Sequence, residues 1–147
     1  MLFATHLLFT GLLAAALWDS LPGERWIFLA IACAAALLPD VDNKRSVLGR
    51  PLHALGGVME HRGLTHTPLA AALLWIALSA LVSPFVGNAV LLGYLGHIML
   101  DSFSKKGIAF LFPLSRRRVR GPVEVGTSSE AALAVVLAIS LAILVLF

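Results

Sequence analysis

The sequence predicts an all-α integral membrane protein, a compact bundle of about five transmembrane helices that forms a single domain over residues 1–147. Hydrophobic residues make up 59% of the chain and charged residues only 13%, with a mean hydropathy of +0.92. Soluble domains usually carry about 25% charged residues, so this composition lies well outside their range. The apolar residues also gather in five nearly charge-free blocks, at positions 2–18, 26–39, 68–82, 85–100 and 131–147.

The first two blocks predict a helical hairpin. Residues 2–18 are long enough to span a bilayer, which takes about 17–25 residues. We interpret them as a retained helix rather than a cleaved signal peptide, because no basic residues precede the apolar run. The second helix, at 26–39, is short for a membrane span and would need residues 21–25 as well to reach that length. Length alone therefore supports two or three spans, although five is the interpretation we favour.

The last three helices are expected at 68–83, 85–101 and 130–147. Thr67 and Pro68 predict the start of the first of these, because threonine caps helix N-termini and proline suits the first helical position. A long connection, 102–129, separates the last two helices. No internal repeat interrupts this order, so we expect one domain.

The basic residues predict the orientation of the helices. Ten of the eleven lie in two of the predicted loops: Lys44, Arg45, Arg50 and Arg62 in one, and Lys105, Lys106, Arg116, Arg117, Arg118 and Arg120 in the other. Five helices would place both loops on the same side, and the positive-inside rule makes that side cytoplasmic, with the N-terminus inside. The high pI then reflects topology, so we expect no nucleic-acid partner. The expected partners are membrane lipids with anionic headgroups.

The side chains that can bind metal fall at the predicted cytoplasmic helix ends. They are His6, Asp40, Asp42, His61, His66, His97 and Asp101. His97 and Asp101 lie four residues apart, which places them on one face of a helix. The orientation rests on lysine and arginine alone, so this convergence is an independent observation.

Such a cluster favours bound metal over an empty pocket. Three carboxylates gathered at a low-dielectric boundary repel one another, and two divalent cations would remove that repulsion. A mixed imidazole and carboxylate shell suits zinc best, with manganese or iron as alternatives. A bound metal lowers the pKa of its water from about 15.7 to near 7. Taken singly, each residue also has an ordinary interpretation, such as a packed histidine at His6 or a helix-end turn at Asp40.

The same residues carry a family resemblance. Six segments span nearly the whole chain in order: HLLF at 6–9, LLPDVD at 37–42, HRGLTHT at 61–67, GYLGHIMLD at 93–101, 107–113 and GTSSE at 126–130. Together they resemble the YdjM-like family, described as LexA-binding, inner-membrane-associated, metal-dependent hydrolases. That family is distantly similar to the zinc-dependent phospholipase C and P1 nuclease group. The resemblance therefore implies a helical metal site that acts on phosphate esters.

The expected activity is hydrolysis of a lipid phosphate ester, in a phospholipid or polyprenyl phosphate, at the cytoplasmic leaflet. The residues expected to act are Asp40, Asp42, His61, His66 and Arg62. Arg62 is expected to hold the substrate phosphate, because a guanidinium matches phosphate oxygens, although it could instead reach for lipid headgroups. The alternative functions are a membrane scaffold, a metal-binding or transport protein, or a metallohydrolase of ester or amide bonds.

One more carboxylate opens the last helix. Glu130 lies in its first turn, where a negative charge is favoured by the helix dipole. We do not include Glu130 among the expected metal ligands.

Overall fold

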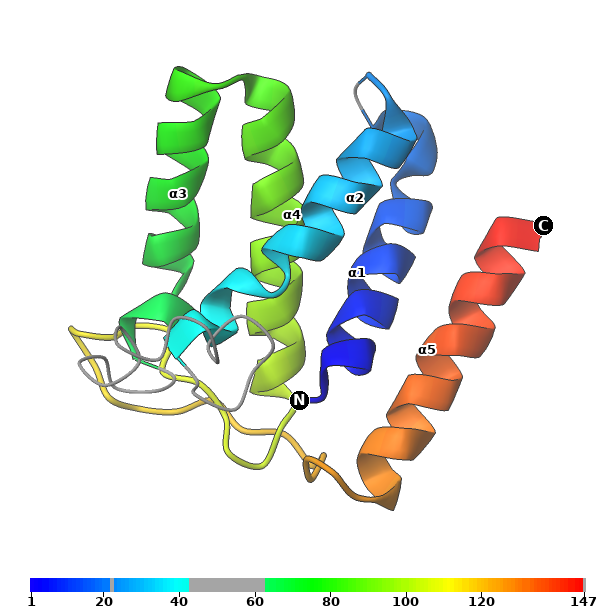
Figure 1. Ribbon diagram of the computed structural model, residues 1–147. Coiled ribbons are helices and arrows are strands. Elements are labelled where there is room, and N and C mark those ends of the chain that lie inside the picture. Colours follow the sequence, from blue (N-terminus) through cyan, green and yellow to red (C-terminus); the bar gives the residue numbers. More distant parts are fainter. Residues whose placement is uncertain (22, 43–62, 147) are drawn as a thin grey trace.

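The computed structural model describes residues 1–21, 23–42 and 63–146, with the side chain of Asp42 excepted. The described chain is helical, as predicted, and its five α-helices run alternately in opposite directions (Figure 1). They are α1 (Phe3–Ala16), α2 (Arg25–Ala35), α3 (Pro68–Leu81), α4 (Pro84–Ser102) and α5 (Ser128–Leu146). Three short 3₁₀ helices join them: η1 (Trp18–Ser20), η2 (Leu38–Asp42) and η3 (Leu64–His66).

Helix α4 is the centre of the bundle and packs against α1, α2 and α3. It has a glycine where each neighbour approaches most closely. Gly87 faces Ser79 of α3, Gly93 faces Ala32 of α2, and Gly96 faces α1. A Cβ added at Gly93 would lie 1.9 Å from the Ala32 carbonyl oxygen, so only glycine fits there. Small residues at such contacts are typical of helix packing in membranes.

The starts of α3 and α4 follow the sequence signals. The Thr67 hydroxyl accepts a hydrogen bond from the Ala70 N–H at 3.2 Å, directly before Pro68. Helix α4 begins in the same way, with the Ser83 hydroxyl accepting from the Val86 N–H at 3.3 Å. The predicted capping of α3 is therefore confirmed.

The first two helices are shorter than predicted. Helix α1 ends at Ala16, because the chain tightens into a 3₁₀ turn in which the Ser20 N–H bonds to the Leu17 carbonyl. Helix α2 ends at Ala35 rather than at residue 39. Proline has no N–H and its ring clashes with the carbonyl four residues earlier, so Pro39 prevents α-helix from continuing past Ala35.

Only α5, among the described helices, is both long and apolar enough to cross a bilayer. Helices α1 and α3 are apolar but have 14 residues each. Helix α5 lies at the edge of the bundle, where it packs mainly against α1 and most of its surface is uncovered (Figure 1). The helical fold is thus established, and the five-span arrangement stays a prediction.

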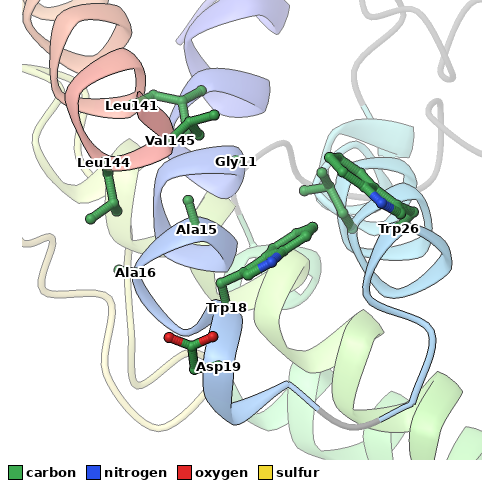
Figure 2. A pocket seen from close by; sticks show the side chains of 10 residues that line it. Gly11, Ala15, Ala16, Trp18, Asp19, Trp26, Leu141, Leu144 and Val145 are labelled. Atoms are coloured by element: carbon green, nitrogen blue, oxygen red, sulfur yellow. The ribbon is translucent and has the colours of Figure 1, made fainter. Parts of the chain in front are cut away.

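The C-terminal end of α1 carries an aromatic group and a hollow. Trp18 and Trp26 meet edge to face at 4.8 Å, with the Arg25 guanidinium 5.8 Å from the Trp18 ring. Both tryptophans line a hollow of about 710 Å³ that is formed by residues of α1, η1, α2 and α5, among them Gly11 and Leu141 (Figure 2).

The close contact at Gly93 generates a stability prediction. Gly93→Ala should destabilise the protein by about 1–3 kcal/mol, since overpacking forces the backbone of α2 away from α4. Gly11→Ala is the matched control, because its Cβ would meet nothing nearer than 3.4 Å. Thermal unfolding in detergent measures both variants. Equal melting temperatures for the two variants would contradict the packing described here.

Candidate metal centre

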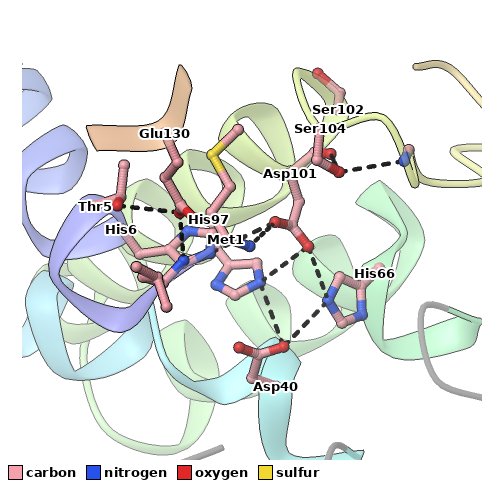
Figure 3. Close-up of polar contacts among 12 residues, drawn as sticks. Met1, Thr5, His6, Asp40, His66, His97, Asp101, Ser102, Ser104 and Glu130 are labelled. Atoms are coloured by element: carbon pink, nitrogen blue, oxygen red, sulfur yellow. Dashed lines mark hydrogen bonds and ion pairs between the residues drawn. The ribbon is translucent and has the colours of Figure 1, made fainter. Parts of the chain in front are cut away.

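Five of the seven expected metal ligands meet at the end of the bundle where α1 begins and α4 ends (Figure 3). They come from α1, η2, η3 and α4, and they are His6, Asp40, His66, His97 and Asp101. Four of them are buried, with 1% exposure or less, whereas the Asp40 side chain is 22% exposed. Segments far apart in the sequence thus deliver imidazoles and carboxylates to one place.

Four of the donor atoms form a closed, four-sided arrangement. The His66 Nε2 lies 3.7 Å from both Asp40 Oδ1 and Asp101 Oδ2. The His97 Nε2 lies 3.9 Å from the same two oxygens. Hydrogen bonds of this kind measure about 2.7–3.2 Å, so these pairs are too far apart for direct bonding. Donor atoms around a tetrahedral zinc ion lie about 3.3 Å apart, given metal–ligand bonds near 2.0–2.1 Å. The spacing therefore fits a shared cation after a small contraction.

His6 extends the cluster on the α1 side. Its ring stacks on the His97 ring, with centroids 3.8 Å apart and planes 3° from parallel. Its Nε2 lies 3.5 Å from Asp101 Oδ1, and the terminal amine of Met1 lies 2.5 Å from the same oxygen. Asp101 therefore directs one oxygen to the four-sided arrangement and the other to His6 and the Met1 amine.

The orientation of His97 is fixed from α2. Its Nδ1 lies 2.6 Å from the Ala36 carbonyl oxygen. A carbonyl can only accept, so Nδ1 carries the proton and Nε2 presents a lone pair to the aspartates. The Ala36 oxygen is free for this bond because carbonyls in the last turn of a helix lack a partner within it. The His97 Nε2 is buried and has no hydrogen-bond partner among the described residues. Metal-binding histidines are typically oriented by this kind of outer bond.

His66 is held by α4 through the segment before α3. The Tyr94 hydroxyl donates to the Thr65 carbonyl at 2.6 Å, which anchors η3 to α4. Beside it, the Thr65 hydroxyl lies 3.1 Å from the His66 Nδ1. Helix α4 thus supplies two ligands, His97 and Asp101, and positions a third.

Asp40 stays ionised in this setting. Burial favours the neutral acid, but the contact with His66 and the electrostatic interactions with His97 and His66 outweigh burial and hold the pKa of Asp40 at about 2. An ionised carboxylate next to three imidazoles has the donor chemistry that zinc, manganese and iron prefer.

The remaining expected residues lie outside the described structure. His61 and Arg62 fall in the part of the chain that is not described, and so does the side chain of Asp42. The two described triads, His6–Asp40–His97 and His66–His97–Asp101, share His97. The His97 Nε2 has one lone pair, so the described donors account for one fully coordinated ion. The second ion expected from the sequence stays a prediction.

The contacts of Glu130 were not predicted from the sequence. Its side chain is 1% exposed and bonds to the start of α1 (Figure 3). A carboxylate in the first turn of an otherwise apolar helix is a usable signal, because buried carboxylates need partners. Sequence alone does not show that these partners belong to the first helix.

The fold and the cluster together define a helical protein of membrane composition, with a buried histidine and aspartate centre suited to a divalent metal. The chain belongs to the YdjM inner membrane protein family, whose model matches residues 1–147. The predicted family is therefore confirmed, and an inner-membrane location is supported. LexA binding and a likeness to phospholipase C or P1 nuclease stay predictions.

Two relatives show how far the similarity extends. The chain is 33% identical over 111 residues to inner membrane protein YdjM of Escherichia coli K12, a match that covers 69% of this chain and 56% of YdjM. It is 30% identical over 108 residues to the uncharacterized protein YvsG of Bacillus subtilis, which covers 70% of this chain and 67% of YvsG. The chain thus spans just over half the length of YdjM. No solved structure matches the chain.

The geometry predicts which carboxylate is needed for metal binding. Asp101→Asn keeps the size of the side chain but removes its charge, so metal bound to the purified protein should fall to background. Elemental analysis by mass spectrometry measures this. Asp19→Asn is the control, because the Asp19 side chain is 98% exposed and lies at the other end of α1. If Asp101→Asn retained as much metal as Asp19→Asn, the cluster would not be the binding site.

Proposed function

We propose that this chain is a membrane-bound, metal-dependent hydrolase that cleaves a phosphate ester of a lipid at the cytoplasmic leaflet. Its helices would cross the inner membrane several times, with the N-terminus cytoplasmic. The bound metal, with zinc as the first candidate, would supply Lewis-acid activation of water at neutral pH.

The observation that supports this proposal most strongly is the spacing of the four donors. The Nε2 atoms of His66 and His97 each face the same Asp40 and Asp101 oxygens at 3.7–3.9 Å, which brings four donors around one point. Structural zinc sites are closed, whereas catalytic sites keep one position accessible. Asp40 is the one described ligand with substantial exposure, so a substrate would approach on its side.

A lipid substrate is favoured by the position of the cluster. It lies at the end of the helices, level with the connection that carries six basic residues between Phe103 and Gly121. A phosphate at headgroup depth could therefore reach the Asp40 side without leaving the bilayer. Arginine and lysine near the site would attract its negative charge. The expected role of Arg62 in holding the phosphate stays part of this proposal.

The arrangement argues against the two rival classes. A transporter needs ligands along a path through the membrane, whereas the described donors are confined to one end of the bundle. A scaffold would not require imidazoles that face carboxylates inside the bundle. Ester or amide substrates remain alternatives within hydrolysis, since the same metal chemistry serves them.

The function is tested by phosphate release. Protein in lipid nanodiscs should release phosphate or a phosphorylated headgroup from a phospholipid or a polyprenyl phosphate, as followed by phosphorus NMR. A chelator should abolish turnover, and added zinc or manganese should restore it. Asp40→Asn should lower turnover by more than about 100-fold. Removing a residue that only orients a metal ligand typically costs about 10–100-fold, and the loss of a ligand itself should cost more.

The controls separate hydrolysis from the alternatives. Asp19→Asn should keep full turnover. If phosphate release were absent while metal stayed bound, a metal-binding role without hydrolysis would replace the proposal. If His97→Ala kept full activity, the metal would have no part in the reaction.

The connection after α4 is proposed to contact anionic lipid. Between Asp101 and Glu124 it has basic residues but no acidic ones, and its exposed apolar side chains include Leu111 and Leu114, at 64% and 93% exposure. The segment is tied to itself by backbone pairing of Ile108 with Val119. A folded loop that combines clustered basic residues with exposed apolar side chains fits an anionic headgroup layer.

A fluorescent probe tests this contact. In a Cys33→Ser background, Leu114→Cys carrying an environment-sensitive dye should emit at shorter wavelength in anionic nanodiscs than in zwitterionic ones. Changing Arg116, Arg117 and Arg118 to alanine should remove the difference, and high salt should weaken it because salt screens exposed charges. Identical emission in both lipids would contradict the proposed contact.

A further inference from the structure

We infer that Glu130 of α5 is a positioning residue for the metal centre, because its carboxylate holds the first turn of α1 and thereby orients His6. The inference rests on the proposed metal site. It adds a residue that is distant from the ion and that connects the helix of membrane-spanning length to the cluster.

Glu130 makes three hydrogen bonds, two to the distant start of α1 and one to Gly126, four residues before it. Its Oε1 accepts from the Leu2 N–H at 2.5 Å and from the Thr5 hydroxyl at 3.2 Å. Its Oε2 accepts from the Gly126 N–H at 2.7 Å. The side chain is 1% exposed, so these bonds are shielded from water. Bonds to a charged acceptor are roughly twice as strong as bonds between neutral groups.

Helix α1 needs such a partner because it has no cap of its own. Its N-cap residue is Leu2, which cannot accept from the first N–H groups, and its first turn has no acidic residue. The first four N–H groups of a helix lack partners within it and carry a partial positive charge. The Glu130 carboxylate satisfies one of these donors and lies at the positive ends of both α1 and α5. It therefore stabilises the N-terminus of α1 from another helix, by accepting from the N–H of the N-cap residue Leu2.

The turn held in this way is the one that carries His6. The His6 N–H bonds to the Leu2 carbonyl at 3.4 Å, and Thr5 directly precedes it. His6 then stacks on His97 at 3.8 Å and faces Asp101. The rest of α1 is packed against α4 and α5 beyond this turn. Loss of the Glu130 bonds should therefore loosen residues 2–6 and misplace His6 while the bundle stays folded.

The experiment compares two glutamates of the same region. Glu130→Gln keeps the shape of the side chain but removes its charge. The new amide NH₂ is a donor, so it cannot accept from every one of the three N–H and O–H groups that Glu130 binds. Glu124→Gln is the matched control, because Glu124 is exposed and pairs with Lys105. Zinc affinity of the purified protein, measured by chelator competition, should fall about 10–100-fold in Glu130→Gln and stay unchanged in Glu124→Gln.

A double-mutant cycle separates positioning from general destabilisation. If Glu130 acts through His6, Glu130→Gln should have no further effect on zinc affinity in a His6→Ala background, because coupled residues are non-additive. Fully additive losses, or the same affinity in Glu130→Gln and Glu124→Gln, would overturn the inference. In both cases the wild-type protein would still bind zinc, so the proposed function would stand.

A second measurement does not depend on metal. In the metal-free protein, amide hydrogen exchange of residues 2–6 should be faster in Glu130→Gln than in wild type or Glu124→Gln, with α4 unchanged. Unchanged exchange in that turn would also overturn the inference. A third outcome is that wild-type protein binds no zinc while exchange of residues 2–6 is still faster in Glu130→Gln. The proposed function would then fail, but the link from Glu130 to the first turn of α1 would hold.

Discussion

The packing of two carboxylates against three imidazoles at one end of a helical bundle is the constraint on which the candidate site depends. Asp40 and Asp101 each lie 3.7–3.9 Å from the Nε2 atoms of His66 and His97, and Asp101 also pairs with the terminal amine of Met1. Opposite charge stabilises carboxylates that are removed from water. A divalent ion among these donors would draw η2, η3 and α4 together.

The packing of α4 makes that arrangement possible. Gly93 lets α2 approach closely enough for the Ala36 carbonyl to reach His97, and Tyr94, the next residue, anchors the segment that carries His66. A single helix therefore orders both sides of the centre. Helix α5 contributes from the edge of the bundle through Glu130, whose bonds secure the first turn of α1.

Much of this could be predicted from the sequence, for identifiable reasons. Charge-free blocks located the five helices, and the i, i+4 spacing of His97 and Asp101 placed both on one face. The order of the five helices along the chain placed the other expected ligands at the same end. The predicted end of α2 was wrong because the apolar run continues to Pro39, whereas the α-helical hydrogen bonding of the backbone does not. The partners of Glu130 and the Ala36 bond depend on contacts between distant segments, which no local pattern records.

The central claim is that His66, His97, Asp40 and Asp101 bind a metal ion together. X-ray absorption spectroscopy of the purified, zinc-loaded protein tests it most directly, because imidazole ligands give a distinctive scattering pattern. We expect a shell of imidazole nitrogens and carboxylate oxygens around the zinc at about 2.0–2.2 Å. A shell of oxygen atoms alone, or zinc that is lost on desalting, would contradict it.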